Sequence, residues 1–389
     1  MKVVYIANIR FPGKRAHAYQ IAKNCESFIA LGYEVCVIAR KNFMSNDASS
    51  AQEFFKLKSR VPVMQIPCVN LLRLSPSKSL AKFAFLLLRA SFKLSLFFLL
   101  FFIEHDALYY TRDPHLLRIL FSFKRDVVLE LHDLSDKQKG IILKYCKKLI
   151  LIVCISHGLK EELIRLGVDE DKILVAHDGV DLEEFRTSAN RQDVRRSLGV
   201  QPEAVLIVYT GSFYKWKGVD LFLEKWTMAP KDFYLLLVGG PQNEFERLGE
   251  IVKKQHLERV ILLPSVPREQ VVRFLAAGDL GLLPTSPYYD IGNKYTSPLK
   301  LFEYLAADLP VLASDVPSSR EVLTEDVARF YRYDGENLAE AFSLLHEELG
   351  WLNNAREMAR NYVRQYTWME RAQNILDAIN ERKGDGISN

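Results

Sequence analysis

Residues 294–315 of the chain read KYTSPLKLFEYLAADLPVLASD, and this segment decides the fold prediction. Ser297 suits a helix N-cap and Pro298 the first helical position, and apolar residues then recur at helical spacing. Pro310 ends the helix, and residues 311–313 form a short apolar run without alternation, which is typical of a buried strand in a parallel sheet. We therefore predict a loop, a helix and a parallel strand in this order.

The start of this helix is predicted to bind an anion. Its free N–H groups and its positive dipole end point into the preceding loop, and Lys300 adds a charge on the first turn. Glu303 lies roughly 8 Å further along the axis, at about 1.5 Å per residue. Its carboxylate is placed to accept the two hydroxyls of a ribose while the helix start holds phosphates. A surface helix with a solvated Glu303 is the alternative reading.

Length and composition limit the class of protein. The 389 residues, 49% hydrophobic and 26% charged, predict an ordinary globular chain of two domains. A net charge of +4 is too small to indicate nucleic-acid binding, but it suits an anionic substrate or a lipid surface. The five cysteines contain no Cys-x-x-Cys pair, and the chain enters directly as a strand. We therefore expect a cytoplasmic protein with reduced thiols and no signal peptide.

Both halves of the chain predict a doubly wound parallel sheet, because apolar strands alternate with helices. In the first half we expect strands at 3–7, 34–39, 107–111, 127–131, 149–156 and 173–176. In the second half we expect them at 204–210, 234–238, 260–263, 280–284, 311–313 and 327–330. The loop at 8–14 lacks Gly-x-Gly-x-x-Gly, so a dinucleotide site there is not supported.

Two further loops carry polar groups. Residues 211–218, GSFYKWKG, place glycines and Lys217 after a strand, where backbone and a point charge can approach a phosphate. Asp169 and Asp171 have the spacing of a metal motif, but they fall in a short turn where acidic residues are simply solvated. We therefore predict no metal site at this turn.

Residues 83–103, FAFLLLRASFKLSLFFLLFFI, are nearly long enough to span a membrane. Arg89 and Lys93 argue against a span, because each costs about 2.5 to 3.5 kcal/mol near a bilayer centre. We predict a helix with one apolar face on the sheet and an outward basic and aromatic face, giving a peripheral membrane contact through 75–103. A core helix whose two basic residues merely reach solvent is the alternative.

Residues 297–307, SPLKLFEYLAA, and 310–322 after them resemble the donor-nucleotide helix of family 4 retaining glycosyltransferases, the group 1 glycosyltransferases. The resemblance implies the GT-B fold: two Rossmann-like domains facing across a cleft, with a C-terminal helix crossing back. We expect an acceptor-side domain at 1–185, a donor domain at 186–365 and a crossover helix and tail at 366–389. Most relatives carry a glutamate where this chain has Tyr295, which leaves open the group that binds the donor sugar.

The resemblance also implies site residues. The catalytic set is His132 on the donor sugar, Lys217 on the diphosphate and Glu303 on the ribose. The donor-binding set is Gly211, Ser212, Lys215, Gly239, Val266, Tyr295, Ser297, Pro298, Leu299 and Lys300. The acceptor-side set is Arg10, Gly13, Lys14, His17 and Arg112. Ser212 replaces an arginine of the family, and Lys215 or Lys300 is expected to stand in for it.

The predicted function is therefore transfer of a sugar, with retention, from a nucleoside-diphosphate donor to a glycan or lipid-linked acceptor. We expect a role in cell-surface polysaccharide or glycolipid synthesis, at the inner face of the cell membrane, with no metal cofactor and no nucleic-acid partner. Two alternatives stay open: a sugar-nucleotide 2-epimerase and a non-catalytic GT-B partner subunit. The sequence names neither the sugar, the base nor the acceptor.

Overall fold

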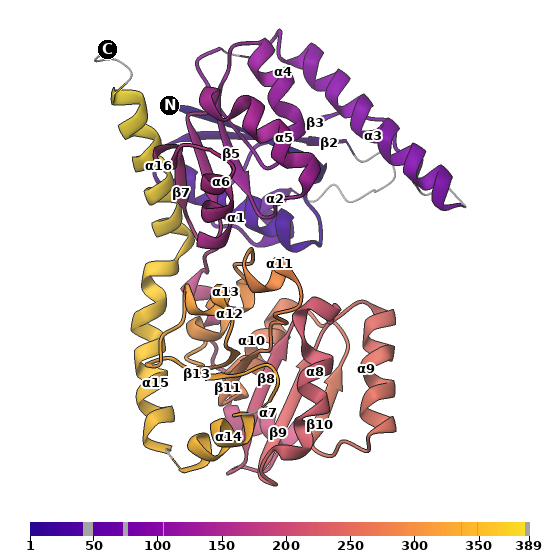
Figure 1. The fold of residues 1–389 in the computed structure, drawn as a ribbon, viewed down its shortest axis with the longest axis vertical. Coiled ribbons are helices and arrows are strands. Elements are labelled where there is room, and N and C mark those ends of the chain that lie inside the picture. Colours follow the sequence, from indigo (N-terminus) through magenta and orange to yellow (C-terminus); the bar gives the residue numbers. More distant parts are fainter. Residues whose placement is uncertain (42–49, 73–76, 104, 336, 348, 386–389) are drawn as a thin grey trace. The chain divides into compact units, whose positions relative to one another are not determined.

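The computed structural model describes residues 1–41, 50–72, 77–103, 105–335, 337–347 and 349–385. The chain forms two compact units (Figure 1). The first comprises Met1–Ile155, Leu159–Ala176 and Trp368–Asn389, and the second comprises Ser156–Gly158 and His177–Thr367. The first unit thus ends at Ala176 rather than at the expected residue 185, and the C-terminal helix belongs to the first unit.

The first unit contains a seven-stranded parallel sheet in the order β3-β2-β1-β4-β5-β6-β7. Its strands are β1 (Lys2–Arg10), β2 (Glu34–Arg40), β3 (Val63–Ile66), β4 (Leu108–Thr111), β5 (Asp126–Leu131), β6 (Leu151–Cys154) and β7 (Ile173–Val175). The sequence prediction missed β3, because this short edge strand exposes Met64 and Gln65 and so lacks an apolar run. The strand order reverses between β1 and β4, where doubly wound sheets open a crevice for ligands.

The second unit contains a six-stranded parallel sheet in the order β10-β9-β8-β11-β12-β13. Its strands are β8 (Val205–Thr210), β9 (Phe233–Val238), β10 (Val260–Leu263), β11 (Leu280–Leu283), β12 (Val311–Ser314) and β13 (Ala328–Tyr331). Every residue of β8, β11 and β12 is buried, which explains the continuous apolar runs of the sequence. The predicted α/β class and both parallel sheets are confirmed.

Helices cover the faces of both sheets. Those that begin in the first unit are α1 (Ala16–Ala30), α2 (Ala51–Phe55), α3 (Lys78–Leu99), α4 (Leu117–Ser122), α5 (Asp136–Tyr145) and α16 (Trp368–Asp385). Helix α6 (His157–Arg165) follows β6. The second unit adds α7 (Arg191–Ser197), α8 (Val219–Glu224), α9 (Gln242–Lys254), α10 (Arg268–Ala277), α11 (Asp290–Asn293), α12 (Leu299–Ala306), α13 (Pro317–Arg320), α14 (Leu338–Glu347) and α15 (Leu349–Tyr362).

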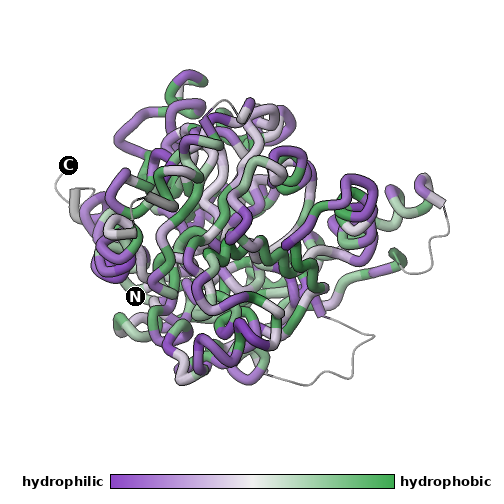
Figure 2. Tube along the Cα trace, turned by 90° about the horizontal axis from the view of Figure 1, so that it is seen from below, coloured by the Kyte–Doolittle hydropathy of each residue, from purple (hydrophilic) through white to green (hydrophobic). Residues whose placement is uncertain are grey.

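Each unit has its own apolar core, and hydrophobic segments gather toward the interior (Figure 2). In the first unit, α16 contributes Ala372, Ile375 and Ile379 to the core that Ala18 and Ile21 of α1 also line. This packing is why the C-terminal helix belongs to the first unit although the second unit precedes it in the chain.

Helix α3 buries only a narrow stripe of its surface. Its buried residues Ala84, Leu88, Phe92 and Leu96 recur every four positions. The other sides expose large apolar residues: Leu80, Phe83, Phe85, Leu86, Leu94, Phe97 and Phe98 on the helix, with Phe101 and Phe102 just after it. Among the helices of the described residues, none has the length and apolar character needed to span a membrane.

The prediction that Arg89 and Lys93 face outward was wrong. The Arg89 Nη2 lies 3.4 Å from the Asp113 Oδ1, and Lys93 is half-buried. Burial lowers the pKa of the Lys93 ammonium, with Asp113 opposing the shift. Both side chains therefore lie toward the sheet edge rather than on the exposed surface, because Asp113 supplies the opposite charge there.

Candidate functional sites in the two units

The second unit has a pocket of about 350 Å³ at the carboxyl ends of β8, β9 and β10. It is lined by Thr210, Gly211, Ser212, Val238, Gly239, Gly240, Pro241, Ser265, Val266 and Val271. Four residues that the sequence assigned to the donor, Gly211, Ser212, Gly239 and Val266, therefore lie together. We call this the donor pocket.

Glycines make the donor pocket possible, because the backbone of two strand ends comes very close there. Gly211 and Gly239 have φ values of +123° and +124°. A Cβ on Gly239 would lie 2.5 Å from the Gly211 carbonyl oxygen, and one on Gly240 would lie 2.3 Å from the Phe213 ring. Only glycine fits such positions, so backbone groups are exposed to a ligand without side chains in the way.

Lys217 lies just after β8 on a single 3-10 turn, Lys215–Lys217. Its Nζ is 3.6 Å from the centroid of the Trp216 ring. Burial lowers the pKa of the ammonium to about 7, although the side chain keeps some exposure. The turn ends at Gly218, whose φ is +74° and whose Cβ would lie 1.8 Å from the Pro284 carbonyl oxygen. Packing therefore requires the glycine of the Lys-Gly pair, and Lys217 supplies its charge.

Lys300 lies beside the same strand ends. It is 8% exposed, and its Nζ is 3.5 Å from the centroid of the Tyr209 ring. A Cβ on Gly211 would lie 3.5 Å from the same Nζ. Burial holds the pKa of Lys300 well below its usual value, Lys217 lowers it further, and Glu303 opposes both. Two desolvated lysines with depressed pKa values thus lie near one pocket, and such groups favour a bound anion.

The start of α12 differs from the prediction by one residue. Helix α12 begins at Leu299, Pro298 is its N-cap, and the Ser297 hydroxyl accepts a hydrogen bond from the Asp178 N–H at 2.9 Å. The assignment of Ser297 as the N-cap was therefore wrong, since its oxygen is engaged by another segment. The free N–H groups of the first turn begin at Leu299 and Lys300.

Tyr304 fixes α12 against the sheet. Its hydroxyl accepts from the Thr210 N–H at 3.1 Å and donates to the Leu282 carbonyl at 3.3 Å. Its ring occupies the space beside Gly281, where a Cβ would lie 2.3 Å from it. A glycine on β11 thus lets α12 approach the sheet, and this contact positions Lys300 and Glu303.

Glu303 has a partner that the sequence did not indicate. Arg268, the first residue of α10, donates to the Glu303 Oε1 at 2.9 Å and to the Glu184 Oε2 at 2.6 Å. The Glu303 carboxylate is 13% exposed, so it is held in one place and still reachable. The sequence held one signal for this contact: Arg268 begins a helix directly after the loop at Val266.

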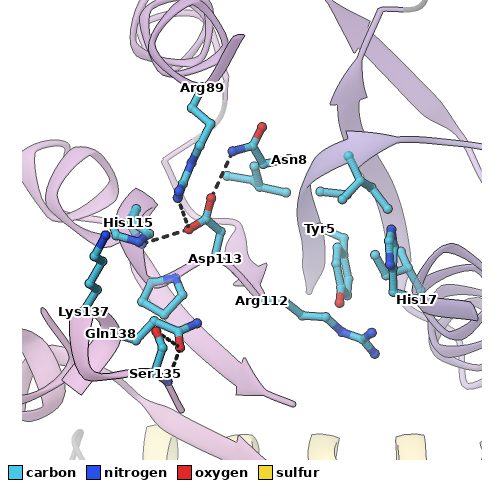
Figure 3. Close-up of a pocket in the computed structure, with 15 residues that line it drawn as sticks. Tyr5, Asn8, His17, Arg89, Arg112, Asp113, His115, Ser135, Lys137 and Gln138 are labelled. Carbon is cyan, nitrogen blue, oxygen red and sulfur yellow. Dashed lines mark hydrogen bonds and ion pairs between the residues drawn. The ribbon is translucent and has the colours of Figure 1, made fainter. Parts of the chain in front are cut away.

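The first unit has a pocket of its own, of about 430 Å³, at the switch point between β1 and β4 (Figure 3). Its polar lining includes Asn8, His17, Arg89, Arg112, Asp113, His115, Ser135, Lys137 and Gln138. Asp113 accepts hydrogen bonds from Asn8 at 3.0 Å and from the His115 N–H at 3.0 Å. Burial lowers the pKa of His17 to about 4, and Arg112 lowers it further. We call this the first-unit pocket.

A buried glutamate organises the edge of this sheet. Glu130 on β5 is fully buried and accepts from Arg112 at 2.5 Å, from the His132 Nε2 at 2.6 Å and from the Tyr110 hydroxyl. The Arg371 Nη2 of α16 lies 3.1 Å away. Burial alone would raise the pKa of Glu130, but the surrounding cations hold it well below its usual value.

Sequence reasoning missed Glu130, although a charged residue inside the apolar run VVLELH was a signal. Its carboxylate explains the place of two predicted residues. Arg112 is clamped between Glu130 and the Gln20 amide oxygen at 2.9 Å, and His132 carries its Nε2 proton toward Glu130.

The remaining predicted residues are placed around these pockets rather than in their linings. Arg10 is the last residue of β1, and Gly13 and Lys14 lie on the loop between β1 and α1. Arg10 and Lys14 are exposed. Lys215 is exposed on the 3-10 turn, and Tyr295 is half-buried before α12. The first-unit pocket is therefore lined by His17 and Arg112 of the acceptor-side set but not by Arg10, Gly13 or Lys14.

The segment that carries the donor pocket matches a known protein family. Residues 204–348, which hold the donor pocket, Lys217 and Glu303, match the family model of the glycosyl transferases group 1. Residues 204–348, within the second unit, therefore form a group 1 glycosyltransferase domain. The predicted family is confirmed, and so is the predicted GT-B fold.

Two relatives show how far the similarity in sequence extends. A D-inositol 3-phosphate glycosyltransferase of Xylanimonas cellulosilytica is 27% identical over 230 residues, which is 56% of this chain and 53% of that protein. The Bacillus subtilis protein TuaH, provisionally named a teichuronic acid biosynthesis glycosyltransferase, is 26% identical over 256 residues, 64% of this chain and 59% of that protein. The matches thus span little more than half of these relatives.

Solved structures share the fold of this chain. Anabaena HepE, solved in complex with UDP, superposes with a TM-score of 0.76 over 98% of this chain and 100% of that one, at 16% identity. At this identity the likeness shows the fold alone.

Metal ligands are not gathered among the described residues. No group of three or more histidine, cysteine, aspartate or glutamate side chains there is arranged to hold an ion. Asp169 instead accepts from the Asp171 N–H at 3.2 Å and caps a short turn. Lys300 and Lys217 are two of the positive charges near the donor pocket: Lys300 lies beside Gly211, and Lys217 interacts with Lys300.

Proposed function

We propose that this protein transfers a sugar, with retention of configuration, from a nucleoside-diphosphate donor to a glycan or lipid-linked acceptor. The observation that carries the proposal is the pair of desolvated lysines, Lys217 and Lys300, beside the glycine-lined donor pocket and the start of α12. The UDP complex of HepE, which has the same fold, supports a nucleoside diphosphate as the ligand.

In this proposal the protein stabilises the charge that develops on the leaving diphosphate. Lys217, Lys300 and the first N–H groups of α12 neutralise the phosphates, so that no metal ion is required. Glu303 accepts the ribose hydroxyls. A diphosphate leaves without a proton, so no general acid is needed, and a front-face attack assisted by the leaving group accounts for retention.

His132 is proposed to bind the donor sugar, and the first-unit pocket to receive the acceptor. Glu130 orients His132 and Arg112 by accepting hydrogen bonds from both. Because His17 and His115 have lowered pKa values in this pocket, both rings are neutral near pH 7 and can accept as well as donate hydrogen bonds. Such a lining suits the hydroxyls of a glycan.

The proposal is tested by Glu303→Ala and Lys217→Ala. Both variants are expected to lose sugar transfer while they keep the unfolding temperature of the parent protein. Lys254→Ala is the matched control, since this lysine is exposed on α9 and belongs to neither the predicted donor set nor a pocket lining. A screen of nucleotide sugars by thermal shift first identifies the donor, because a ligand that binds the folded state raises its stability.

Three results would redirect the proposal. Transfer at the parent rate in both variants would refute the donor site. Conversion of a nucleotide sugar into its epimer without acceptor would identify an epimerase instead. Stabilisation by a nucleotide sugar without turnover, together with activation of a second transferase, would identify a partner subunit. NMR of the product anomer decides between retention and inversion.

We further propose that α3 and the residues after it bind the membrane that carries a lipid-linked acceptor. The support is the set of exposed apolar side chains, of which Phe83 is 63% and Phe102 is 87% exposed. Lys78 and Lys82, both exposed, add charge for anionic headgroups. Residues 75 and 76 of the predicted contact lie outside the described part of the chain.

Flotation with anionic liposomes measures this contact. The protein is expected to rise with the liposomes, and Phe83→Ser/Phe102→Ser should stay at the bottom of the gradient. Met228→Ser/Met369→Ser is the matched control, because these exposed methionines lie on other elements. Failure of the parent protein to float would exclude the membrane contact without affecting the donor site.

A further inference from the structure

The second unit has another pocket, at the opposite edge of the sheet from the donor pocket. Its lining includes Gly278, just before β11, and 306–309, just before β12. It therefore opens at the amino ends of the strands, whereas the donor pocket lies at their carboxyl ends. Its volume is about 510 Å³, a size typical of small-molecule sites.

Arginines dominate the polar lining of this pocket. They come from two stretches of the chain, 186–191 and 356–364: Arg186, Arg191, Arg356, Arg360 and Arg364. The acidic residue among the lining side chains is Asp308. We call this the arginine pocket. The apolar part of its wall is formed by Leu182, Phe185, Ala276, Ala306, Ala307, Leu309 and Val363.

Ion pairs inside the structure compensate only part of this positive charge. Asp279 accepts from Arg191 at 2.5 Å, from Arg356 at 2.8 Å and from the buried Arg195 at 3.0 Å. One carboxylate thus serves three guanidinium groups. The Arg356 Nε is buried and has no hydrogen-bond partner among the described residues. Burial lowers the pKa of Arg356, and Arg191 and Arg195 lower it further.

The other three arginines extend the positive charge toward solvent. Arg360 donates to Asp308 at 3.0 Å and remains 65% exposed. Arg186 pairs with Glu183 at 3.0 Å, where both side chains are exposed and held weakly. Arg364 is exposed and has no ion pair with a described residue. The pocket therefore presents more guanidinium donors than acceptors.

We propose that the arginine pocket binds the phosphate group of a phosphorylated small molecule, at a site separate from the donor pocket. Guanidinium groups bind phosphate through paired hydrogen bonds and are less strongly hydrated than ammonium groups. The apolar wall fits a non-phosphate portion of the same molecule. The phosphate can belong to a free metabolite or to a lipid headgroup, and the experiment separates these two sources.

The two pockets of the second unit share one helix. Ala306 and Ala307 at the end of α12 line the arginine pocket, and Lys300 and Glu303 lie near the start of the same helix. A ligand in the arginine pocket thus contacts the element that carries two residues of the proposed donor site.

The probe is inorganic pyrophosphate, titrated calorimetrically into full-length Lys217→Ala protein, in which the proposed donor site is weakened. Arg360→Gln/Arg364→Gln removes two charges at exposed positions, so that folding is preserved. Arg273→Gln is the matched control, because this exposed arginine of α10 lies outside the pocket lining. We expect the double variant to bind pyrophosphate at least tenfold more weakly and the control variant to bind it unchanged.

Flotation with liposomes that contain phosphatidic acid distinguishes the two sources, provided that parent and double variant both carry Phe83→Ser/Phe102→Ser, which removes the proposed α3 contact. Equal flotation of the parent protein and the double variant assigns the site to a soluble phosphate compound, and reduced flotation of the double variant assigns it to a lipid headgroup. No detectable pyrophosphate binding, or equal affinities in all variants, would overturn the proposal. Neither result depends on sugar transfer, so the donor-site proposal stands or falls separately.

Discussion

Diphosphate binding by this protein is expected to weaken as the pH rises above 7, and Lys217 is the reason. Burial lowers the pKa of Lys217 to about 7, so the ammonium form is the minor form in the free protein at pH 8. A bound diphosphate places negative charge near the Nζ and raises its pKa again. Binding therefore draws a proton from solvent, and the cost of this protonation grows with pH.

The size of the effect follows from the pKa. Each pH unit well above 7 reduces the protonated fraction of free Lys217 about tenfold, which costs about 1.4 kcal/mol of binding free energy. Between pH 7 and pH 9 the apparent Kd is expected to rise about fifty-fold. The lowered pKa of Lys300 acts in the same direction. The diphosphate itself adds little over this range, because its last phosphate proton is lost near pH 6.

Calorimetric titration of a nucleoside diphosphate measures both consequences. At pH 8, titrations in two buffers of different ionisation enthalpy should show uptake of about one proton per ligand in the parent protein. Lys217→Met is expected to bind more weakly at pH 7 and to lose most of the pH dependence. Lys254→Met, at an exposed position of α9, should keep it.

A Kd that stays constant between pH 7 and pH 9 in the parent protein would refute this reasoning. So would an equal slope in Lys217→Met, since the slope would then belong to another group.

Two further predictions concern the supports of the sites. Gly218→Ala is expected to destabilise the fold by about 2 kcal/mol or more and to weaken donor binding, because its Cβ would strike the Pro284 carbonyl; Gly199→Ala, at φ +70° with open space, should cost only about 1 kcal/mol and leave binding unchanged. Glu130→Gln should lower the free energy of unfolding by about 3 to 5 kcal/mol, because it leaves buried cations unpaired. Asp126→Asn on the same strand, whose exposed carboxylate also pairs with α16, should cost under about 1 kcal/mol in chemical denaturation. Equal losses within either pair would contradict the role of burial.

Local sequence was a good guide where a strand is buried on both faces. Runs such as 205–210 and 311–313 are apolar throughout because helices cover both sides, and they were recognised on that ground. The edge strand β3 was missed because it exposes half of its residues. Asp308, just after α12, has the left-handed conformation that often ends a helix, with a φ of +57°.

Side-chain partners could not be read in this way. The Ser297 hydroxyl binds a backbone N–H that is 119 positions away in the chain, so a capping rule based on neighbours assigned it wrongly. Arg89 was expected at a membrane surface, but Asp113 from another element holds it. In both cases the deciding group is distant in sequence.

The sequence by itself determined the α/β class, the parallel sheets and the glycine and lysine motifs, because these depend on local periodicity and on residue types that few positions accept. Only the tertiary structure decided which charges meet. Glu130 gathers Arg112, His132 and Arg371 from three elements, and Glu303 finds Arg268. The physical reason is that burial and ion pairing depend on atoms brought together by folding, and these set the protonation and position of every group in the sites.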